Sequence, residues 1–154
     1  MDVEKAIREY LQQVIHMSLA TCRDNSPWVC EVHFVYDDEL NLYFRSTPAR
    51  RHSEEIADNP HVAGNIVTQH HAGQKVRGVY FEGRAAKLAA VDENHVAYIE
   101  YCKRLGTGPE ILEEAASDTG HGFYQISVSD FYLFDSYITN PSQKFHLPWG
   151  HPSN

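Results

Sequence analysis

Residues 42–53, LYFRSTPARRHS, contain the features on which the fold and the function of this chain depend. Bulky and aromatic side chains at the start of the stretch predict a strand over 40–45, and two hydroxyl side chains follow it. Pro48 ends the extended segment, and few β-branched residues occur between it and the Asn-Pro pair at 59–60. The stretch therefore predicts a strand, a short turn and a helix over 49–58.

Hydroxyl and basic side chains gather at the predicted start of this helix. Ser46 and Thr47 offer O–H donors, and a helix N-terminus offers backbone N–H groups without partners. Arg51 adds a guanidinium that forms charge-assisted hydrogen bonds with phosphate. We therefore expect a phosphate site here. The alternative is a helix capped by a hydroxyl, with the arginines in solvent.

Short alternating segments separated by turns extend outward from this stretch in both directions. They predict six strands, at 17–23, 28–36, 40–45, 62–67, 76–88 and 123–137, and helices at 2–16, 49–58, 92–104 and 110–116. The tail, 139–154, contains three prolines and is predicted to be loop-like. Because consecutive strands mostly follow one another directly, the order favours a mainly β, antiparallel barrel with flanking helices in a single domain, 1–154.

Composition excludes several classes of protein. The 154 residues include 13 Lys and Arg against 21 Asp and Glu, and the resulting net charge of −8 argues against a broad nucleic-acid surface. No apolar run is long enough to span a bilayer, and the first residues lack the pattern of a secretory signal. Three cysteines without CxxC spacing fit a reduced, cytoplasmic protein.

Known chemical motifs are absent from the sequence. It contains no GxSxG, P-loop or GxGxxG pattern, which argues against a serine hydrolase, a P-loop nucleotide hydrolase and Rossmann-type NAD binding. Despite ten histidines, no HExxH or CxxC…H spacing is present, so we expect no metal site. The adjacent histidines at 70–71 are expected to be solvent-exposed loop residues.

From about residue 4 to about residue 135, the chain resembles the FMN-binding split barrels related to pyridoxamine 5′-phosphate oxidase. The similarity looks closest to a bacterial branch of small, mostly uncharacterised members. The matching pieces, taken in order, are Leu19-Ala20-Thr21, Pro27 with the strand through Phe34, Leu42-Tyr43-Phe44 with Ser46-Thr47, Arg51-His52, Asn59-Pro60-His61-Val62-Ala63, and Arg77-Gly78-Val79-Tyr80-Phe81-Glu82-Gly83.

The resemblance implies a six-stranded antiparallel split barrel that forms a homodimer, with an FMN in each cleft between the protomers. It implies that the second strand runs along the flavin ring and that a basic residue of the tail approaches the ring or a substrate. The residues that it assigns to the cofactor are Glu31, Val32, His33, Arg45, Ser46, Thr47, Arg51, His52 and Lys144. Two alternatives stay open, namely that His33 is a packing residue and that Lys144 is an ordinary surface lysine.

Two departures from the family bear on the substrate. The family often has lysine where this chain has His52, whose charge depends on pH near neutrality. The tail segment 146–151 lacks the arginine of true pyridoxamine-phosphate oxidases. We therefore expect an FMN-dependent oxidoreductase that acts on an unidentified small molecule, with no protein nucleophile and no nominated catalytic residue. The alternative is a non-catalytic flavin or haem carrier, since His-rich relatives of this fold bind haem.

Overall fold

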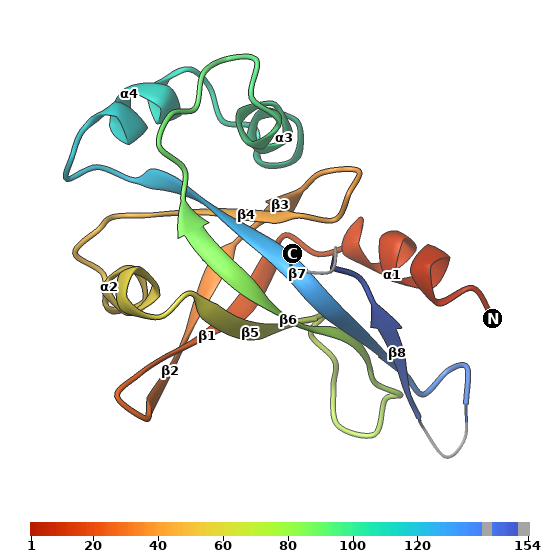
Figure 1. Ribbon diagram of the computed structural model, residues 1–154. Helices are drawn as coiled ribbons and strands as arrows, with labels where there is room; N and C mark the ends of the chain where they lie inside the picture. The colour runs from red at the N-terminus through yellow and green to blue at the C-terminus, as the bar shows by residue number, and fades with distance from the viewer. Residues whose placement is uncertain (140–142, 151–154) are drawn as a thin grey trace.

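The computed structural model describes residues 1–139 and 143–150, which form one curled antiparallel sheet with helices at its margins (Figure 1). The hydrogen-bonded strand order is β2-β1-β5-β6-β7-β4-β3, and β8 also pairs with β7. The strands are β1 (His16–Arg23), β2 (Ser26–His33), β3 (Val35–Tyr36), β4 (Leu42–Ser46), β5 (His61–Val67), β6 (Arg77–Lys87), β7 (Gly122–Asp135) and β8 (Lys144–Pro148). The helices are α1 (Val3–Leu11), α2 (Arg51–Asp58), α3 (Val96–Leu105) and α4 (Glu110–Ala116).

The longest strand, β7, lies at the centre of the strand pairing. It pairs with β6 along one edge, and with β4 and then β8 along the other. The register of β6 and β7 shifts between Glu82 and Gly83, which confirms the bend expected at Gly83. A Cβ atom there would overlap the carbonyl oxygen of Ser127, so the close approach of the two strands requires glycine. No such shift occurs at Gly78.

Side chains alternate along β4 between two cores. Leu42 and Phe44 lie in the interior of the curled sheet, whereas Tyr43 belongs to a second cluster. This second cluster lies under α3 and α4, which form a separate lobe beside β4 and the start of β7 (Figure 1). The interior core also takes residues from α1, including the fully buried Ile7. Both faces of β4 are therefore covered, which fixes where its C-terminal end lies.

Helix boundaries differ from the sequence predictions at two places. Helix α1 ends at Leu11 rather than residue 16, because the chain tightens into a turn before β1 begins at His16. Helix α3 begins at Val96 rather than 92, because a ring nitrogen of His95 accepts a hydrogen bond from the Ala97 N–H and caps the helix. The bounds of α2 lie within the predicted 49–58, and α4 is confirmed.

The predicted strand count was too low by two. The predicted strand 28–36 is interrupted at the fully buried Phe34, so that β2 pairs with β1 whereas β3 pairs with β4. The tail was predicted to be loop-like, and that is wrong for β8, whose Phe145 and Leu147 pack against the interior core while alternate residues face outward. The mainly β, antiparallel split-barrel class is confirmed, with eight strands in the described residues.

Candidate functional site

The residues predicted to bind phosphate lie at the junction between β4 and α2. The Arg50 N–H donates to the Thr47 carbonyl oxygen at 3.2 Å, which closes the turn between the strand and the helix. Arg50 occupies the N-cap position with an extended backbone, and no side chain caps the helix through a hydrogen bond. The alternative in which a hydroxyl caps α2 is therefore wrong, and the first N–H groups of the helix remain available to an acceptor.

Two buried hydroxyls lie beside this helix start. Ser53 donates to the Ser46 hydroxyl oxygen at 2.9 Å, and the Ser46 hydroxyl donates to the Thr47 carbonyl oxygen at 3.3 Å. The side chains of Ser46 and Ser53 are 3% and 4% exposed. Ser46 was predicted from the sequence but Ser53 was not, although a position two residues after Arg51 in a helix is adjacent to the N-terminus.

His52 has a buried nitrogen without a partner. Its side chain is 8% exposed, and among the described residues nothing hydrogen-bonds to its Nε2. Burial lowers the pKa of His52, with a smaller contribution in the same direction from the Arg50 charge, so the ring favours its neutral form. A neutral imidazole either donates or accepts one hydrogen bond at Nε2, which matches a phosphate oxygen or a hydroxyl of a ligand.

Arg51 lies on the other side of the helix start, against the hairpin of β1 and β2. Its Nε donates to both carboxylate oxygens of Glu55, at 3.3 and 3.5 Å, and its Nη2 donates to the Ser26 hydroxyl at 3.4 Å. The guanidinium also lies 4.4 Å from the ring centroid of Trp28. Glu55 was not among the predicted site residues, although its four-residue spacing from Arg51 along a helix indicates the contact.

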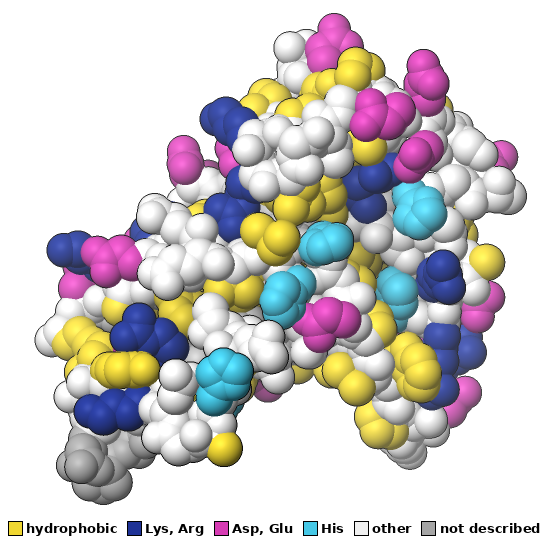
Figure 2. All heavy atoms as spheres, turned by 180° about the vertical axis from the view of Figure 1, so that it is seen from behind, with side chains coloured by type: hydrophobic (Ala, Val, Ile, Leu, Met, Phe, Trp, Pro, Cys, Tyr) yellow, Lys and Arg dark blue, Asp and Glu magenta, His cyan; other side chains and the backbone are white. Residues whose placement is uncertain are grey.

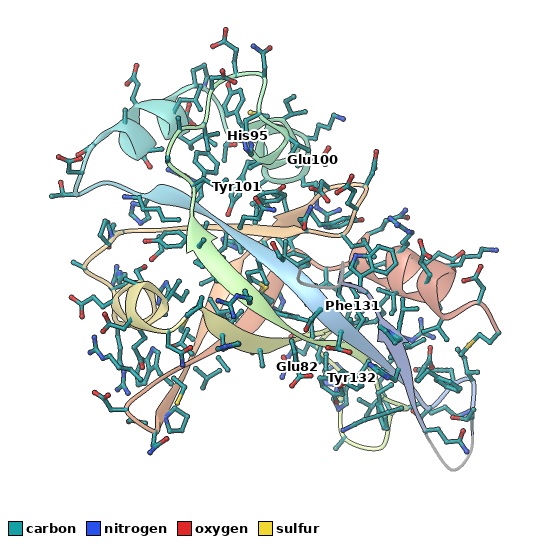
Figure 3. All side chains as sticks on the ribbon, viewed as in Figure 1. Glu82, His95, Glu100, Tyr101, Phe131 and Tyr132 are labelled. Atoms are coloured by element: carbon teal, nitrogen blue, oxygen red, sulfur yellow. The ribbon has the colours of Figure 1, made fainter. Side chains whose placement is uncertain are left out.

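Arg45 does not join this group. It points to the opposite face of β4 from Ser46, into the second cluster. There its Nη2 donates to Glu114 at 2.7 Å and to the His121 carbonyl oxygen at 3.2 Å. Tyr101 of that lobe, labelled in Figure 3, lies on the same side of the strand. Within one chain, the structure therefore separates Arg45 from the hydroxyls that precede α2.

Strand β2 brings Glu31 and His33 to an open edge of the sheet. The Phe34 N–H donates to the Ile15 carbonyl oxygen, and the same register makes Val32 and Met17 a hydrogen-bonded pair. By the alternation of an antiparallel ladder, the N–H groups of Glu31 and His33 point away from β1. No other described strand pairs with β2. The Val32 side chain packs inward, so only its neighbours present side chains to the outer face.

A polar cluster covers this part of the outer face. His33 lies opposite His16 in the β1–β2 register, and both are exposed. The carboxylate of Glu31 accepts from the Ser18 hydroxyl at 2.8 Å and lies 2.9 Å from His16 Nδ1. Figure 2 shows histidine side chains gathered around an acidic one across the middle of the face seen from behind. His16 and Ser18 were not among the predicted site residues, because the sequence does not show the register that places them opposite His33 and Glu31.

Lys144 lies on β8, at the far side of the sheet from β2. Its Nζ sits 5.2 Å from the ring centroid of Tyr80 on β6. Nearby, Tyr132 donates to Glu82 at 3.1 Å, and Figure 3 shows both side chains on this part of the sheet. Four strands separate β8 from β2 in the sheet order. One chain alone does not bring Lys144 together with the other predicted residues.

An open pocket of about 800 Å³ lies between α2 and the ends of β6 and β7. Its apolar lining includes Pro48, Ile56, Ala57, Pro60, Ala85, Ala86 and Tyr124, and Ser53 also borders it.

In the described part of the chain, no three His, Cys, Asp or Glu side chains come together in a metal-binding group. None of the helices within residues 1–139 and 143–150 is long and apolar enough to cross a bilayer.

Residues 3–134 match the family described as pyridoxamine 5′-phosphate oxidase. The chain belongs to this family. The resemblance inferred from the ordered sequence motifs is thereby confirmed. Among curated proteins, a UPF0306 protein of Photorhabdus laumondii is 29% identical over 100 residues, which cover 64% of this chain and 69% of that protein. A UPF0306 protein of Yersinia pestis is 27% identical over 100 residues, covering 64% and 67%.

Solved structures with the same fold include one protein named as an oxidase and two named for haem. A Listeria innocua protein named after pyridoxamine 5′-phosphate oxidase superposes with a TM-score of 0.65 at 20% identity, covering 86% of this chain and 98% of that one. A haem-binding protein from Mycobacterium smegmatis gives 0.72 at 15%, covering 92% and 55%, so this chain spans about half its length. HutZ, the haem storage protein of Vibrio cholerae, gives 0.60 at 20%, covering 82% and 89%. These likenesses establish the split-barrel fold.

Proposed function

We propose that this protein binds FMN at the β4–α2 junction and is a flavin-dependent oxidoreductase that acts on an unidentified small molecule. The observation that carries the proposal is the donor set around an uncapped helix start. The backbone N–H groups of the first turn of α2, the guanidinium of Arg51 and the His52 Nε2, which has no partner among the described residues, lie there. The buried Ser46 and Ser53 hydroxyls lie beside them and are hydrogen-bonded to one another. In a chain of net charge −8, such a concentration of donors favours a phosphate group.

The residues present fit the phosphate of FMN in number and kind. Arg51 has its Nη1 free of any acceptor among the described residues, and Thr47 adds a hydroxyl at the same turn. The carboxylate of Glu55 offsets part of the positive charge, so the backbone N–H groups of α2 matter correspondingly more. The outward N–H groups of Glu31 and His33 would donate to the polar edge of the flavin ring.

FMN supplies electron or hydride transfer when bound, and the protein contributes binding, orientation and electrostatics. Glu31 is held by the Ser18 hydroxyl and lies beside His16, so its carboxylate has a fixed place at the strand edge. A ring bound along that edge would have its position set by the β2 backbone. Segment 146–150 carries no arginine for a second phosphate, so pyridoxamine 5′-phosphate itself is not the proposed substrate.

A homodimer is part of the proposal. Strand β2 is an edge strand, and its Trp28 and Val29 are 40% and 60% exposed. An open, partly apolar edge usually needs cover, which a second copy of the chain would provide. A flavin lying along β2 would otherwise have one side of its ring in water. The partner's surface would close that side and bring further residues to the site.

The purified protein tests the proposal directly. We expect a yellow protein with flavin absorption bands after reconstitution with FMN, and weaker binding of riboflavin, which lacks the phosphate. Light scattering should give twice the mass of the chain. FMN and riboflavin binding with equal affinity would contradict the phosphate site, and no binding of either would contradict the proposal as a whole.

Haem is the second candidate ligand. His16 and His33 lie opposite one another on the exposed face of the β1–β2 pair, and imidazole is a common axial ligand of haem iron. The similarity in fold to a haem-binding protein and to a haem storage protein supports testing it. A Soret band that appears on addition of haem, and is lost in the His16→Ala/His33→Ala double variant, would favour haem over flavin.

A further inference from the structure

A buried carboxylate, that of Glu55, lies beside Arg51 in the proposed phosphate site. Glu55 is 1% exposed, although it belongs to a short helix at the edge of the molecule. One of its oxygens accepts a hydrogen bond from the Thr21 hydroxyl at 3.4 Å, and both accept from Arg51 Nε. A buried carboxylate without a positive partner is costly, so this carboxylate and this guanidinium hold one another in place.

The contacts of Arg51 leave one part of its guanidinium free. Its Nε donates to Glu55, its Nη2 donates to Ser26, and the Trp28 ring covers one face of the guanidinium. Its Nη1 has no acceptor among the described residues, and the Arg51 side chain is 44% exposed. A long arginine side chain loses much rotamer entropy when a ligand fixes it, and here the protein has already fixed it.

We propose that Glu55 is a positioning residue, which holds Arg51 so that its free Nη1 faces the phosphate of bound flavin. This inference rests on the proposed function. Charge repulsion alone predicts the reverse effect. A carboxylate near the phosphate should weaken FMN binding, so its removal should strengthen FMN binding. Positioning requires the opposite, because a released guanidinium must be ordered again each time that FMN binds.

Glu54 provides a matched control. It is the preceding residue of the same helix and carries the same charge at the same end, but it is exposed and forms no hydrogen bond or ion pair with Arg51. Glu54→Gln therefore reports the effect of removing one negative charge near the helix start. Glu55→Gln removes the same charge and also the hold on Arg51.

The experiment is a titration of full-length protein with FMN and with riboflavin, followed by quenching of flavin fluorescence. For Glu55→Gln we expect the ratio of FMN affinity to riboflavin affinity to fall about 5- to 30-fold, equivalent to about 1–2 kcal/mol. For Glu54→Gln we expect a change of less than about twofold, toward tighter FMN binding. Riboflavin affinity should stay the same in both variants, which also shows that they are folded.

A double variant tests whether Glu55 acts through Arg51. Adding Glu55→Gln to Arg51→Ala should leave the affinity ratio at the Arg51→Ala value. An unchanged or increased ratio in Glu55→Gln alone, or a further fall in the double variant, would overturn the inference. If Glu55→Gln does not fold, Glu55→Asp keeps the charge but shortens its reach, and the same fall is expected. A wild type that does not distinguish FMN from riboflavin would instead overturn the proposed function, and this inference with it.

Discussion

The guanidinium of Arg51 stacks on the indole ring of Trp28, with 4.4 Å between Cζ and the ring centroid. This contact joins the start of α2 to β2, two elements that the sequence separates by two strands, β3 and β4, with a turn between them and a loop after them. The guanidinium of Arg51, the candidate phosphate donor, therefore lies next to the edge strand β2.

Arg51→Ala should weaken FMN binding by roughly 10- to 150-fold, because a charge-assisted hydrogen bond to phosphate contributes about 1.5–3 kcal/mol. Riboflavin should bind the variant and the wild type with similar affinity. Arg50→Ala is the matched control. Arg50 precedes α2 at the N-cap position and is exposed, so its removal should cost less than about fivefold. Equal FMN affinities for wild type and Arg51→Ala would assign Arg51 a structural role only.

His52 should make the protein less stable in mild acid. Burial lowers its pKa in the folded protein, so the unfolded chain binds the proton more readily. As the pH falls below about 6.5, the free energy of unfolding should decrease, until the pH reaches the lowered pKa of the folded state. Urea denaturation across this range should show a smaller decrease for His52→Asn than for wild type. His70→Asn, in an exposed loop, serves as the control, and identical profiles would contradict the prediction.

Gly64→Ala should destabilise the fold by about 1–3 kcal/mol, because the sheet core has no room for a methyl group there. A Cβ atom on Gly64 would overlap the carbonyl oxygen of Ser18 and lie 2.5 Å from Cζ of Phe81. Asn65→Ala, on the next residue, should change stability by less than about 0.5 kcal/mol. Urea denaturation measures both. A neutral Gly64→Ala would mean that β1 and β6 lie further apart at this point.

Trp149→Phe should cost about 0.5–1.5 kcal/mol of stability, the usual contribution of one hydrogen bond. Trp149 Nε1 donates to the Glu39 carbonyl oxygen at 2.7 Å, and the Arg8 guanidinium lies 5.6 Å from the centroid of its ring. Trp149 therefore connects the residues that follow β8 to α1 and to the turn before β4. Trp149→Ala should cost more, since the ring also packs against the interior core. If both variants are as stable as wild type, the contacts of Trp149 do not contribute to stability.

Val29→Lys should shift the protein toward the monomer. Val29 is 60% exposed on the open edge strand β2, where the proposed partner would cover it. A lysine would be buried without a partner in that interface, which is strongly unfavourable. Light scattering across a dilution series should show the change. Glu93→Lys, at an exposed position in the loop before α3, should leave the mass unchanged.

The sequence by itself determined the local order of the elements. The alternation in each β segment, the Asn-Pro stop after α2 and the glycine at the bulge were sufficient to predict an antiparallel barrel with flanking helices. These features depend on neighbours within a few residues, whose preferences are set by backbone sterics and side-chain period. Strand β8 was not predicted, because it is short and lies among prolines, which obscure the alternation of Phe145 and Leu147.

Only the tertiary structure decided which predicted residues meet. Ser46 and Arg45 are adjacent in sequence, yet the strand period sends them to opposite faces of β4, one toward Ser53 and the other toward Glu114. Conversely, Arg51 meets Trp28 and Ser26 through the curl of the sheet, which no local pattern encodes. The burial of Glu55 and of His52 Nε2 has the same origin. Both depend on helix and sheet packing between segments distant in the chain, and such packing fixes the environment of a charge or a donor.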